Sequence, residues 1–236
     1  MISVIITSYK EPKTIGRAIE AIAKQKVKDI EIIVVAPDDE TLNEAKKYSK
    51  KYPEVKTIKD AGKGKSAALN LAVSKAKGDI LVLTDGDVYV GNNSISEITK
   101  EFNNSKVGAI SGNVISLNSR KNMYGYWSHV LTGIANELRI ETLNHNKPFI
   151  CTGYFFAIRK KLFPKLPEEL LSEDGYISQM VYEKGYLIKY APEAKVFVKF
   201  PTNLKDWILQ KKRSAGGYNQ IKKLTGTTYR SFGSEA

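Results

Sequence analysis

Short apolar runs alternate with amphipathic stretches along the first half of the chain. A β-branched run at residues 3–7 is followed by apolar residues at helical spacing up to about Lys26, and a second continuous apolar run covers residues 31–36. A strand that is buried on both faces of a parallel sheet has such a continuous run. The alternation continues with a predicted helix at 38–50, strand at 55–58, helix at 64–77 and strand at 79–84. Repeated strand–helix units of this length predict an α/β fold with a Rossmann-like, mostly parallel, doubly wound sheet flanked by helices.

The second half of the chain has a less regular pattern. It predicts strands at 107–115, 151–158 and 196–200, and helices at 124–143, at 173–184 and from about Asn203 onward. No internal repeat or low-complexity linker separates the halves, so we expect one continuous domain over 1–236. Ligands of such sheets bind beyond the carboxyl ends of the strands, which makes the polar segments 7–11, 36–39 and 85–87 the candidates for chemistry.

The composition indicates a soluble globular protein. Apolar residues make up 42% of the chain and charged residues 26%, which argues against disorder. The single cysteine, Cys151, excludes an intramolecular disulfide framework and a multi-cysteine zinc site. No apolar run approaches the roughly 18 residues that span a bilayer, and the N-terminus lacks the basic start of a signal peptide. We therefore expect a cytoplasmic protein.

The net charge of +12 is concentrated in two segments, 46–65 and 199–236. Such clusters are typical of proteins that bind nucleic acid, an anionic membrane surface or a phosphorylated substrate, although a solvated lysine-rich surface would look the same. No nucleic-acid recognition module is legible, so we expect no nucleic-acid partner. The tail mixes Trp207 and Ile208 with lysines, which suits peripheral binding at the inner face of a membrane.

Two carboxylates separated by one glycine follow the predicted strand at 79–84. Asp85 and Asp87 therefore lie in a loop at the carboxyl end of a buried strand. Hard cations such as Mg²⁺ and Mn²⁺ take oxygen ligands and often share them with substrate phosphates. A plain turn would also explain the pattern, but its position favours a divalent-cation site.

Six ordered motifs carry a family resemblance. They are Ser-Val-Ile-Ile-Thr-Ser-Tyr-Lys-Glu-Pro (3–12), Glu-Ile-Ile-Val-Val with Pro-Asp-Asp-Glu-Thr (31–35 and 37–41), Gly-Lys-Ser-Ala-Ala-Leu-Asn (64–70), Asp-Gly-Asp (85–87), Ser-Glu-Asp (172–174) and Gln-Lys-Lys-Arg (210–213). With these motifs the chain resembles the family 2 glycosyltransferases, which have the GT-A fold, across nearly its whole length. The resemblance implies a nucleotide-sugar-binding half at 1–115 and an acceptor-binding half at 116–236 with a basic C-terminal helix.

The resemblance also implies roles for single residues. The residues expected to bind the nucleotide are Thr7, Tyr9, Glu11, Asp38, Lys65 and Asp85, with Asp38 at the uracil edge. Asp87 and Asp85 are expected to bind a metal ion, Mg²⁺ or Mn²⁺, that contacts the diphosphate. Gln210 and Arg213 are expected to bind the diphosphate directly. Asp174 would be the general base that deprotonates the acceptor, although Ser172–Asp174 would equally suit a helix cap.

The activity implied is metal-dependent, inverting transfer of a sugar from a nucleotide diphosphate, a UDP-sugar, to an acceptor hydroxyl. Ser214 stands where cellulose- and hyaluronan-type synthases have a tryptophan, which favours single transfer over polymerisation. The acceptor is expected to be a glycan or a lipid-linked molecule, and a polyprenyl-phosphate sugar transferase is the alternative within the fold. Alternatives of another class are a non-catalytic nucleotide-sugar binder and a basic nucleic-acid-binding protein.

Overall fold

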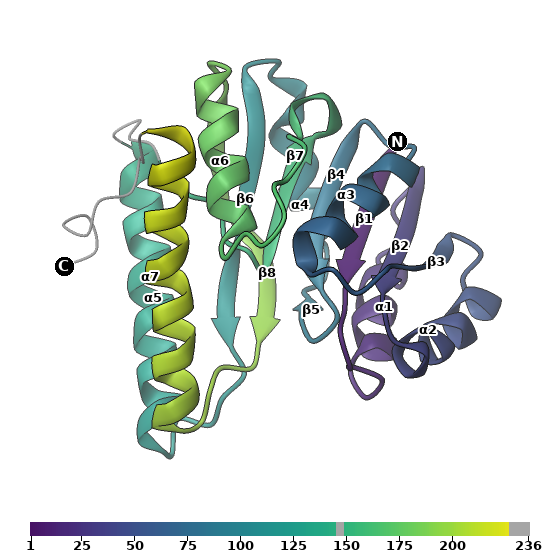
Figure 1. Ribbon diagram of the computed structural model, residues 1–236, viewed down its shortest axis with the longest axis horizontal. Helices are drawn as coiled ribbons and strands as arrows, with labels where there is room; N and C mark the ends of the chain where they lie inside the picture. Colours follow the sequence, from purple (N-terminus) through teal and green to yellow (C-terminus); the bar gives the residue numbers. More distant parts are fainter. Residues whose placement is uncertain (145–148, 227–236) are drawn as a thin grey trace.

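A single curved sheet organises the molecule, as a computed structural model that describes residues 1–144 and 149–226 shows (Figure 1). Within those residues the sheet has eight strands in the order β3-β2-β1-β4-β7-β6-β8-β5. The strands are β1 (Ile2–Thr7), β2 (Ile30–Ala36), β3 (Val55–Lys59), β4 (Ile80–Asp85), β5 (Tyr89–Val90), β6 (Val107–Ser116), β7 (Phe155–Arg159) and β8 (Leu187–Val198). The helices are α1 (Ile15–Ala23), α2 (Asp39–Lys51), α3 (Lys65–Lys75), α4 (Ser94–Thr99), α5 (Met123–Asn144), α6 (Glu173–Glu183) and α7 (Leu204–Thr225).

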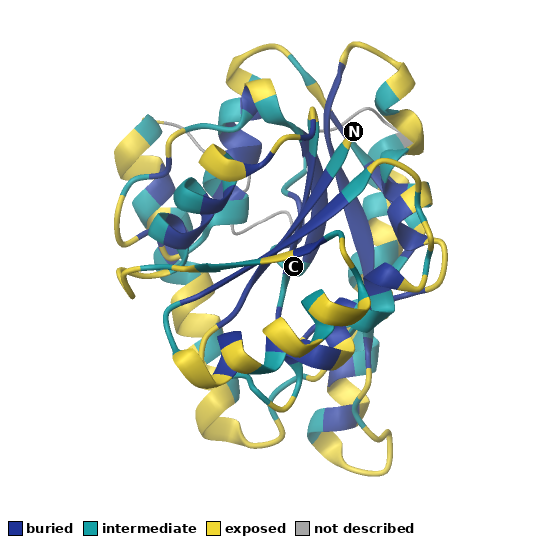
Figure 2. Ribbon diagram, turned by 90° about the vertical axis from the view of Figure 1, so that its right-hand side faces the viewer, coloured by how far each residue is buried: buried dark blue, intermediate teal, exposed yellow. Residues whose placement is uncertain are grey.

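The N-terminal half of the sheet is parallel and doubly wound, as predicted. Strands β3, β2, β1 and β4 pair in parallel. Val4 and Ile6 belong to one core with α1, α2 and α4, whereas Ile5 belongs to a second core with α3 and α6. Because alternate side chains of β1 enter opposite cores, both faces are covered by helices and the strand is apolar throughout. Figure 2 shows the buried strands between helices whose outer surfaces are exposed.

The middle of the sheet contains an antiparallel strand that brings a loop to the site. β7 lies between β4 and β6 and is antiparallel to both. Phe155, the first residue of β7, pairs with Thr84 near the end of β4. The residues just before β7 therefore lie at the same edge of the sheet as Asp85. Cys151, in this loop, is buried.

Several element boundaries in the second half differ from the predicted ones. Residues 151–154 are not in a strand, because the N–H groups of Cys151 and Thr152 bond the hydroxyls of Ser178 and Ser111 instead of a strand partner. β8 begins at Leu187 rather than at residue 196, since its long pairing with β6 includes polar positions that hid it. The short β5 and α4 carried too little periodicity to be predicted.

The two longest helices, α5 and α7, are poorly covered. In α7 the buried residues are Gly217 and Ile221, both in its C-terminal half. No helix in the described ranges combines the length and the apolar character needed to cross a membrane. The predicted C-terminal helix begins after Asn203 as expected, and the last part of the predicted domain, 227–236, lies outside the described residues.

Candidate functional site

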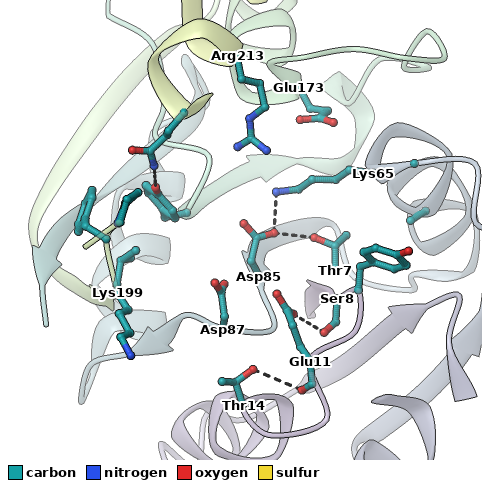
Figure 3. A pocket seen from close by; sticks show the side chains of 18 of the residues that line it. Thr7, Ser8, Glu11, Thr14, Lys65, Asp85, Asp87, Glu173, Lys199 and Arg213 are labelled. Carbon is teal, nitrogen blue, oxygen red and sulfur yellow. Dashed lines mark hydrogen bonds and ion pairs between the residues drawn. The ribbon is translucent and has the colours of Figure 1, made fainter. Parts of the chain in front are cut away.

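A cavity of about 1200 Å³ lies at the carboxyl ends of β1 and β4 (Figure 3). Eight of the ten residues predicted from the sequence line it: Thr7, Tyr9, Glu11, Lys65, Asp85, Asp87, Gln210 and Arg213. They come from β1 and its following loop, from α3, from the end of β4 and from α7. The parallel sheet therefore gathers motifs that are far apart in the sequence at one edge.

Asp85 is held from two sides. Thr7 and Asp85 are partners in the β1–β4 register, and the Thr7 hydroxyl donates to Asp85 Oδ1 at 2.7 Å. The Lys65 ammonium lies 2.6 Å from the same oxygen. Burial alone would lower the pKa of Lys65, but the carboxylates of Asp85 and Glu173 outweigh it and raise the pKa above its usual value. Lys65 is therefore a fixed positive charge on the cavity wall.

Two further acidic side chains, Glu11 and Asp87, lie beside this ion pair. Burial, together with the charges of Asp87 and Asp85, raises the pKa of Glu11 to about 7, although a hydrogen bond from Ser8 opposes the shift. Burial and the charge of Asp85 also raise the pKa of Asp87. Neighbouring carboxylates that repel in this way are a set of oxygen donors whose repulsion a bound cation would relieve.

Gly86 allows these side chains to approach the Asp85–Asp87 loop. A Cβ atom at this position would overlap Ser8 Oγ and lie 2.5 Å from Glu11 Oε2. A side chain there would have to displace Ser8 and Glu11, so the glycine lets the loop after β1 pack directly against the loop after β4. The separation of the two aspartates by glycine is therefore a packing requirement as well as a turn.

The two predicted metal ligands face the cavity, but two carboxylates alone do not complete the coordination shell of a metal ion. Asp85 and Asp87 both face the cavity, and Figure 3 shows Asp87 and Glu11 on the same side of it. No group of three or more His, Cys, Asp or Glu side chains is arranged to hold a metal ion in the part of the chain that the structure describes. Mg²⁺ commonly binds one or two carboxylates and completes its shell with water and substrate phosphates, so these residues fit such an ion.

Asp38 does not line the cavity. Its carboxylate caps α2 by accepting from the Thr41 N–H at 2.9 Å, and it also accepts from the Lys10 N–H at 2.8 Å. Both oxygens are thus used to fix the loop after β1 against the start of α2. Asp60, at the end of β3, does line the cavity.

The two acidic residues at the start of α6 take different positions. Glu173 faces the main cavity, and burial raises its pKa. Asp174 lines a smaller adjoining cavity, which Lys65, Asp85 and Glu173 also line. The Ser172 hydroxyl donates to Asp174 Oδ1 at 2.7 Å and makes no capping bond to the helix. The cap explanation of this motif therefore does not account for the Ser172 side chain.

Helix α7 closes the cavity from the opposite side. Gln210 and Arg213 are one helical turn apart, so both face the cavity. Gln210 Nε2 donates to the Tyr154 hydroxyl at 2.9 Å. Arg213 points toward the acidic cluster from above in Figure 3, near Glu173. The cavity thus places Asp85 and Asp87, at the end of β4, opposite Arg213 on α7.

Comparison with known proteins identifies the family. The model of glycosyl transferase family 2 matches residues 3–166. The chain belongs to this family. Two curated relatives match nearly the whole chain. Over 93% of its length, the chain is 28% identical to the probable glycosyltransferase YdaM of Bacillus subtilis. Over 93% of its length, it is also 22% identical to the poly-beta-1,6-N-acetyl-D-glucosamine synthase of Staphylococcus aureus. It spans 56% and 55% of those proteins, or about half their length.

Solved structures agree with the GT-A fold of this family 2 chain. The mannosyltransferase PcManGT from Pyrobaculum calidifontis, in complex with GDP-Man and Mn²⁺, superposes with a TM-score of 0.74 at 20% identity, covering 96% of this chain and 65% of that one. Staphylococcus aureus TarS in complex with UDP-GlcNAc gives 0.66 at 18% identity, covering 99% and 69%. The predicted fold is confirmed.

Some cavity residues of the family 2 chain were not predicted. Glu173 belonged to a quoted motif, but the neighbouring Asp174 alone was given a role. Tyr154 lines the cavity at its α7 side. Arg17 and Lys199 also line the cavity, and neither lies in a motif that singles it out. Lys199 follows β8, which pairs with β6 and β5 far from it in the sequence.

Proposed function

We propose that the protein is an inverting, metal-dependent glycosyltransferase that moves a sugar from a nucleotide diphosphate, a UDP-sugar, to an acceptor hydroxyl. The observation that carries the proposal is one cavity that combines Asp85 and Asp87 with Lys65 and Arg213. Paired carboxylates suit a divalent cation, and the flanking cations suit a diphosphate. The complexes of PcManGT with GDP-Man and of TarS with UDP-GlcNAc support a nucleotide-sugar donor in this fold.

In this proposal residues 1–115 bind the nucleotide. Thr7, Tyr9 and Glu11, with Lys65, line the β1 side of the cavity and would hold the base and ribose. Tyr9 is 62% exposed, so its ring is available for stacking on a base. Asp38 would contribute by fixing the loop that carries these residues, because both its oxygens are already bonded to that loop and to α2.

The leaving diphosphate requires positive charge. Asp85 and Asp87 would hold Mg²⁺ or Mn²⁺, which neutralises charge on the departing diphosphate when bound. Arg213 and Gln210 would bind phosphate oxygens from α7, and the Arg213 guanidinium can do so bidentately. Lys65 keeps Asp85 oriented by its 2.6 Å contact.

Transfer requires a base on the acceptor side. Asp174 would accept the proton of the acceptor hydroxyl, and its bond from Ser172 leaves the second carboxylate oxygen, Oδ2, beside Gly153. One base without a nucleophile on the opposite face favours direct displacement, which inverts the configuration at the transferred carbon.

The half at 116–236 is proposed to bind the acceptor. Ser214 follows Arg213 where a stacking tryptophan would support polymerisation, so a single transfer is proposed. The acceptor would be a glycan or a lipid-linked molecule, with a polyprenyl phosphate as the alternative. The named activity of one relative, a poly-beta-1,6-N-acetyl-D-glucosamine synthase, supports a glycan acceptor.

A donor screen tests this proposal. Thermal unfolding would be followed with a panel of UDP- and GDP-sugars, each with Mn²⁺ and with EDTA, and a bound donor is expected to raise Tm only with the cation. Release of UDP on addition of glycan or lipid-linked acceptors would show transfer. Binding without any turnover would support the non-catalytic binder instead, and a folded protein that binds none of the donors would refute the proposal.

We also propose a peripheral position at the inner, anionic face of a membrane. The exposed surface of α7 carries Leu204, Ile208 and Leu209 among lysines, and α5 exposes Trp127 and Ile134. Apolar side chains beside basic ones suit an anionic lipid surface. Flotation with vesicles of phosphatidylglycerol and phosphatidylcholine, compared with phosphatidylcholine alone, measures this. Equal flotation in both would contradict the proposal.

A further inference from the structure

Helix α7 is anchored to the rest of the protein mainly at its C-terminal end. Gly217 and Ile221, its buried residues, pack on Ser172 and Gly175, where added Cβ atoms on the glycines would lie within 2.6 Å of Ser172 Cβ and Ile221 Cδ1. Gln220 adds two hydrogen bonds to the loop before α6. The residues that line the cavity, Gln210 and Arg213, lie nearer the other end of the helix. A separate contact must fix that end over the cavity.

Tyr154 makes that contact. Its hydroxyl accepts from Gln210 Nε2 at 2.9 Å, which joins α7 to the loop before β7. The other side-chain bonds described for the N-terminal turns of α7 are local, from Trp207 to Pro201 and between Asn203 and Asp206. Within the described residues, Gln210–Tyr154 is thus the hydrogen bond that ties this half of α7 to a distant element.

Tyr154 is itself firmly placed beside the predicted metal site. Its carbonyl accepts from the Thr84 hydroxyl at 2.9 Å, and Thr84 directly precedes Asp85. Its ring packs edge-on against Phe200, with 6.0 Å between centroids. Burial and the charge of Asp85 raise the pKa of Tyr154 to about 12, so the phenol stays neutral at physiological pH. The hydroxyl is therefore a rigid acceptor for Gln210.

We propose that Tyr154 is a positioning residue, which holds Gln210, and through the same helix Arg213, over the diphosphate side of the cavity. This inference rests on the proposed function, because the diphosphate is the ligand that the two α7 side chains would grip. Tyr154 acts through Gln210. Its removal therefore loosens the α7 side chains without changing the groups on the β1 side that would hold the base and ribose.

The test compares Tyr154→Phe with Tyr190→Phe. Tyr190 is the control, because its hydroxyl also bonds a side-chain amide (Asn136 Oδ1, 2.6 Å) and it does not line the cavity. Affinities for UDP and UMP would be measured with Mn²⁺ by calorimetry. We expect Tyr154→Phe to weaken UDP binding about three- to tenfold and to leave UMP binding nearly unchanged. Tyr190→Phe should change neither.

A double-mutant cycle with Gln210→Leu identifies the route of the effect. If Tyr154 acts through Gln210, adding Tyr154→Phe to Gln210→Leu causes no further loss of UDP affinity. Additive losses, an equal loss for UMP, or unchanged UDP binding in Tyr154→Phe would each overturn the inference. A wild-type protein that binds neither UDP nor GDP would instead refute the proposed function, so the two failures are distinguishable.

Discussion

Lys65 and Asp85 meet at 2.6 Å although one begins α3 and the other ends β4. The same Asp85 oxygen accepts from Thr7, so a single carboxylate connects three motifs. Side chains of both partners are partly exposed, at 35% and 24%, which means that solvent weakens the ion pair. Its importance is therefore in orientation and in the local field more than in stability.

Lys65→Met should weaken donor binding more than folding. Loss of the ammonium leaves Asp85 without its cation beside Asp87, so we expect about a tenfold loss of UDP-sugar affinity and a small change in Tm. Lys63→Met, two residues earlier in an exposed loop, is the control and should keep wild-type affinity. Calorimetric titration of both variants measures this. A large loss of Tm with unchanged affinity would show that Lys65 is structural.

The raised pKa of Glu11 predicts how stability depends on pH. Its folded-state pKa of about 7 exceeds the ordinary value of 4.5, so the folded protein binds more protons than the unfolded chain between these values. The contribution of Glu11 to the free energy of unfolding therefore falls as pH rises from about 4.5 to about 7. Glu11→Gln removes this dependence. In EDTA we expect it to raise Tm relative to wild type more at pH ~7.5 than at pH ~5.

Two further measurements make this prediction specific. Glu40→Gln, at an exposed position in the first turn of α2, should show the same Tm difference from wild type at both pH values. Mn²⁺ should stabilise wild type more than Glu11→Gln, because a cation relieves the repulsion among Glu11, Asp85 and Asp87. An identical effect of Glu11→Gln at the two pH values would argue that the carboxyl is not desolvated in the folded protein.

The sequence predicted the part of the fold whose signal is local. The strands of the parallel half are continuous apolar runs, because each has a core on both faces. Their ends marked the segments that carry Thr7 and Asp85, which the β1–β4 register places side by side. β5 and the first part of β8 escaped prediction, since their pairing is decided by strands far away in the sequence. Tyr154 reaches the site for the same reason: β7 runs antiparallel to β4, a direction that no local pattern encodes.

The roles within the site were harder to predict than its members. Asp38 lies in a motif and at a strand end, yet its oxygens bond Lys10 and Thr41 rather than facing the cavity. The position of an aspartate in the sequence cannot tell whether it binds a ligand or caps a helix, because both kinds follow a strand and precede a helix. The orientation of Glu173 and Asp174 likewise depends on packing against Gly153 and Lys65.

Gly86 is predicted to be essential for the geometry of the two acidic loops. The Cβ atom of Gly86→Ala would meet Ser8 Oγ and Glu11 Oε2, so both side chains must move from their present positions. We expect a loss of about 1–3 kcal/mol in the free energy of unfolding and a loss of Mn²⁺-dependent donor binding. Gly133→Ala is the control: this exposed position in α5 has no atom within 4 Å of an added Cβ, and it should stabilise the helix by up to about 1 kcal/mol.

Asp174 is predicted to be the base even though Glu173 faces the larger cavity. The distinction can be made because Asp174→Asn and Glu173→Gln each remove one carboxylate with little change in shape. Asp174→Asn should lower kcat about 10²- to 10⁴-fold while donor affinity survives. Glu173→Gln should leave kcat within about tenfold of wild type, because the strongest charge interaction of Glu173 is with Lys65, on the donor side.

Gly153→Ala provides a third, independent probe of the same base. The added Cβ would lie 3.1 Å from Asp174 Oδ2, a close contact that shifts the carboxylate by a few tenths of an ångström without removing it. Because catalysis by a positioned base depends steeply on geometry, kcat should fall while UDP affinity stays the same. The opposite ranking, with Glu173→Gln inactive and both Asp174→Asn and Gly153→Ala near wild-type activity, would transfer the role of base to Glu173.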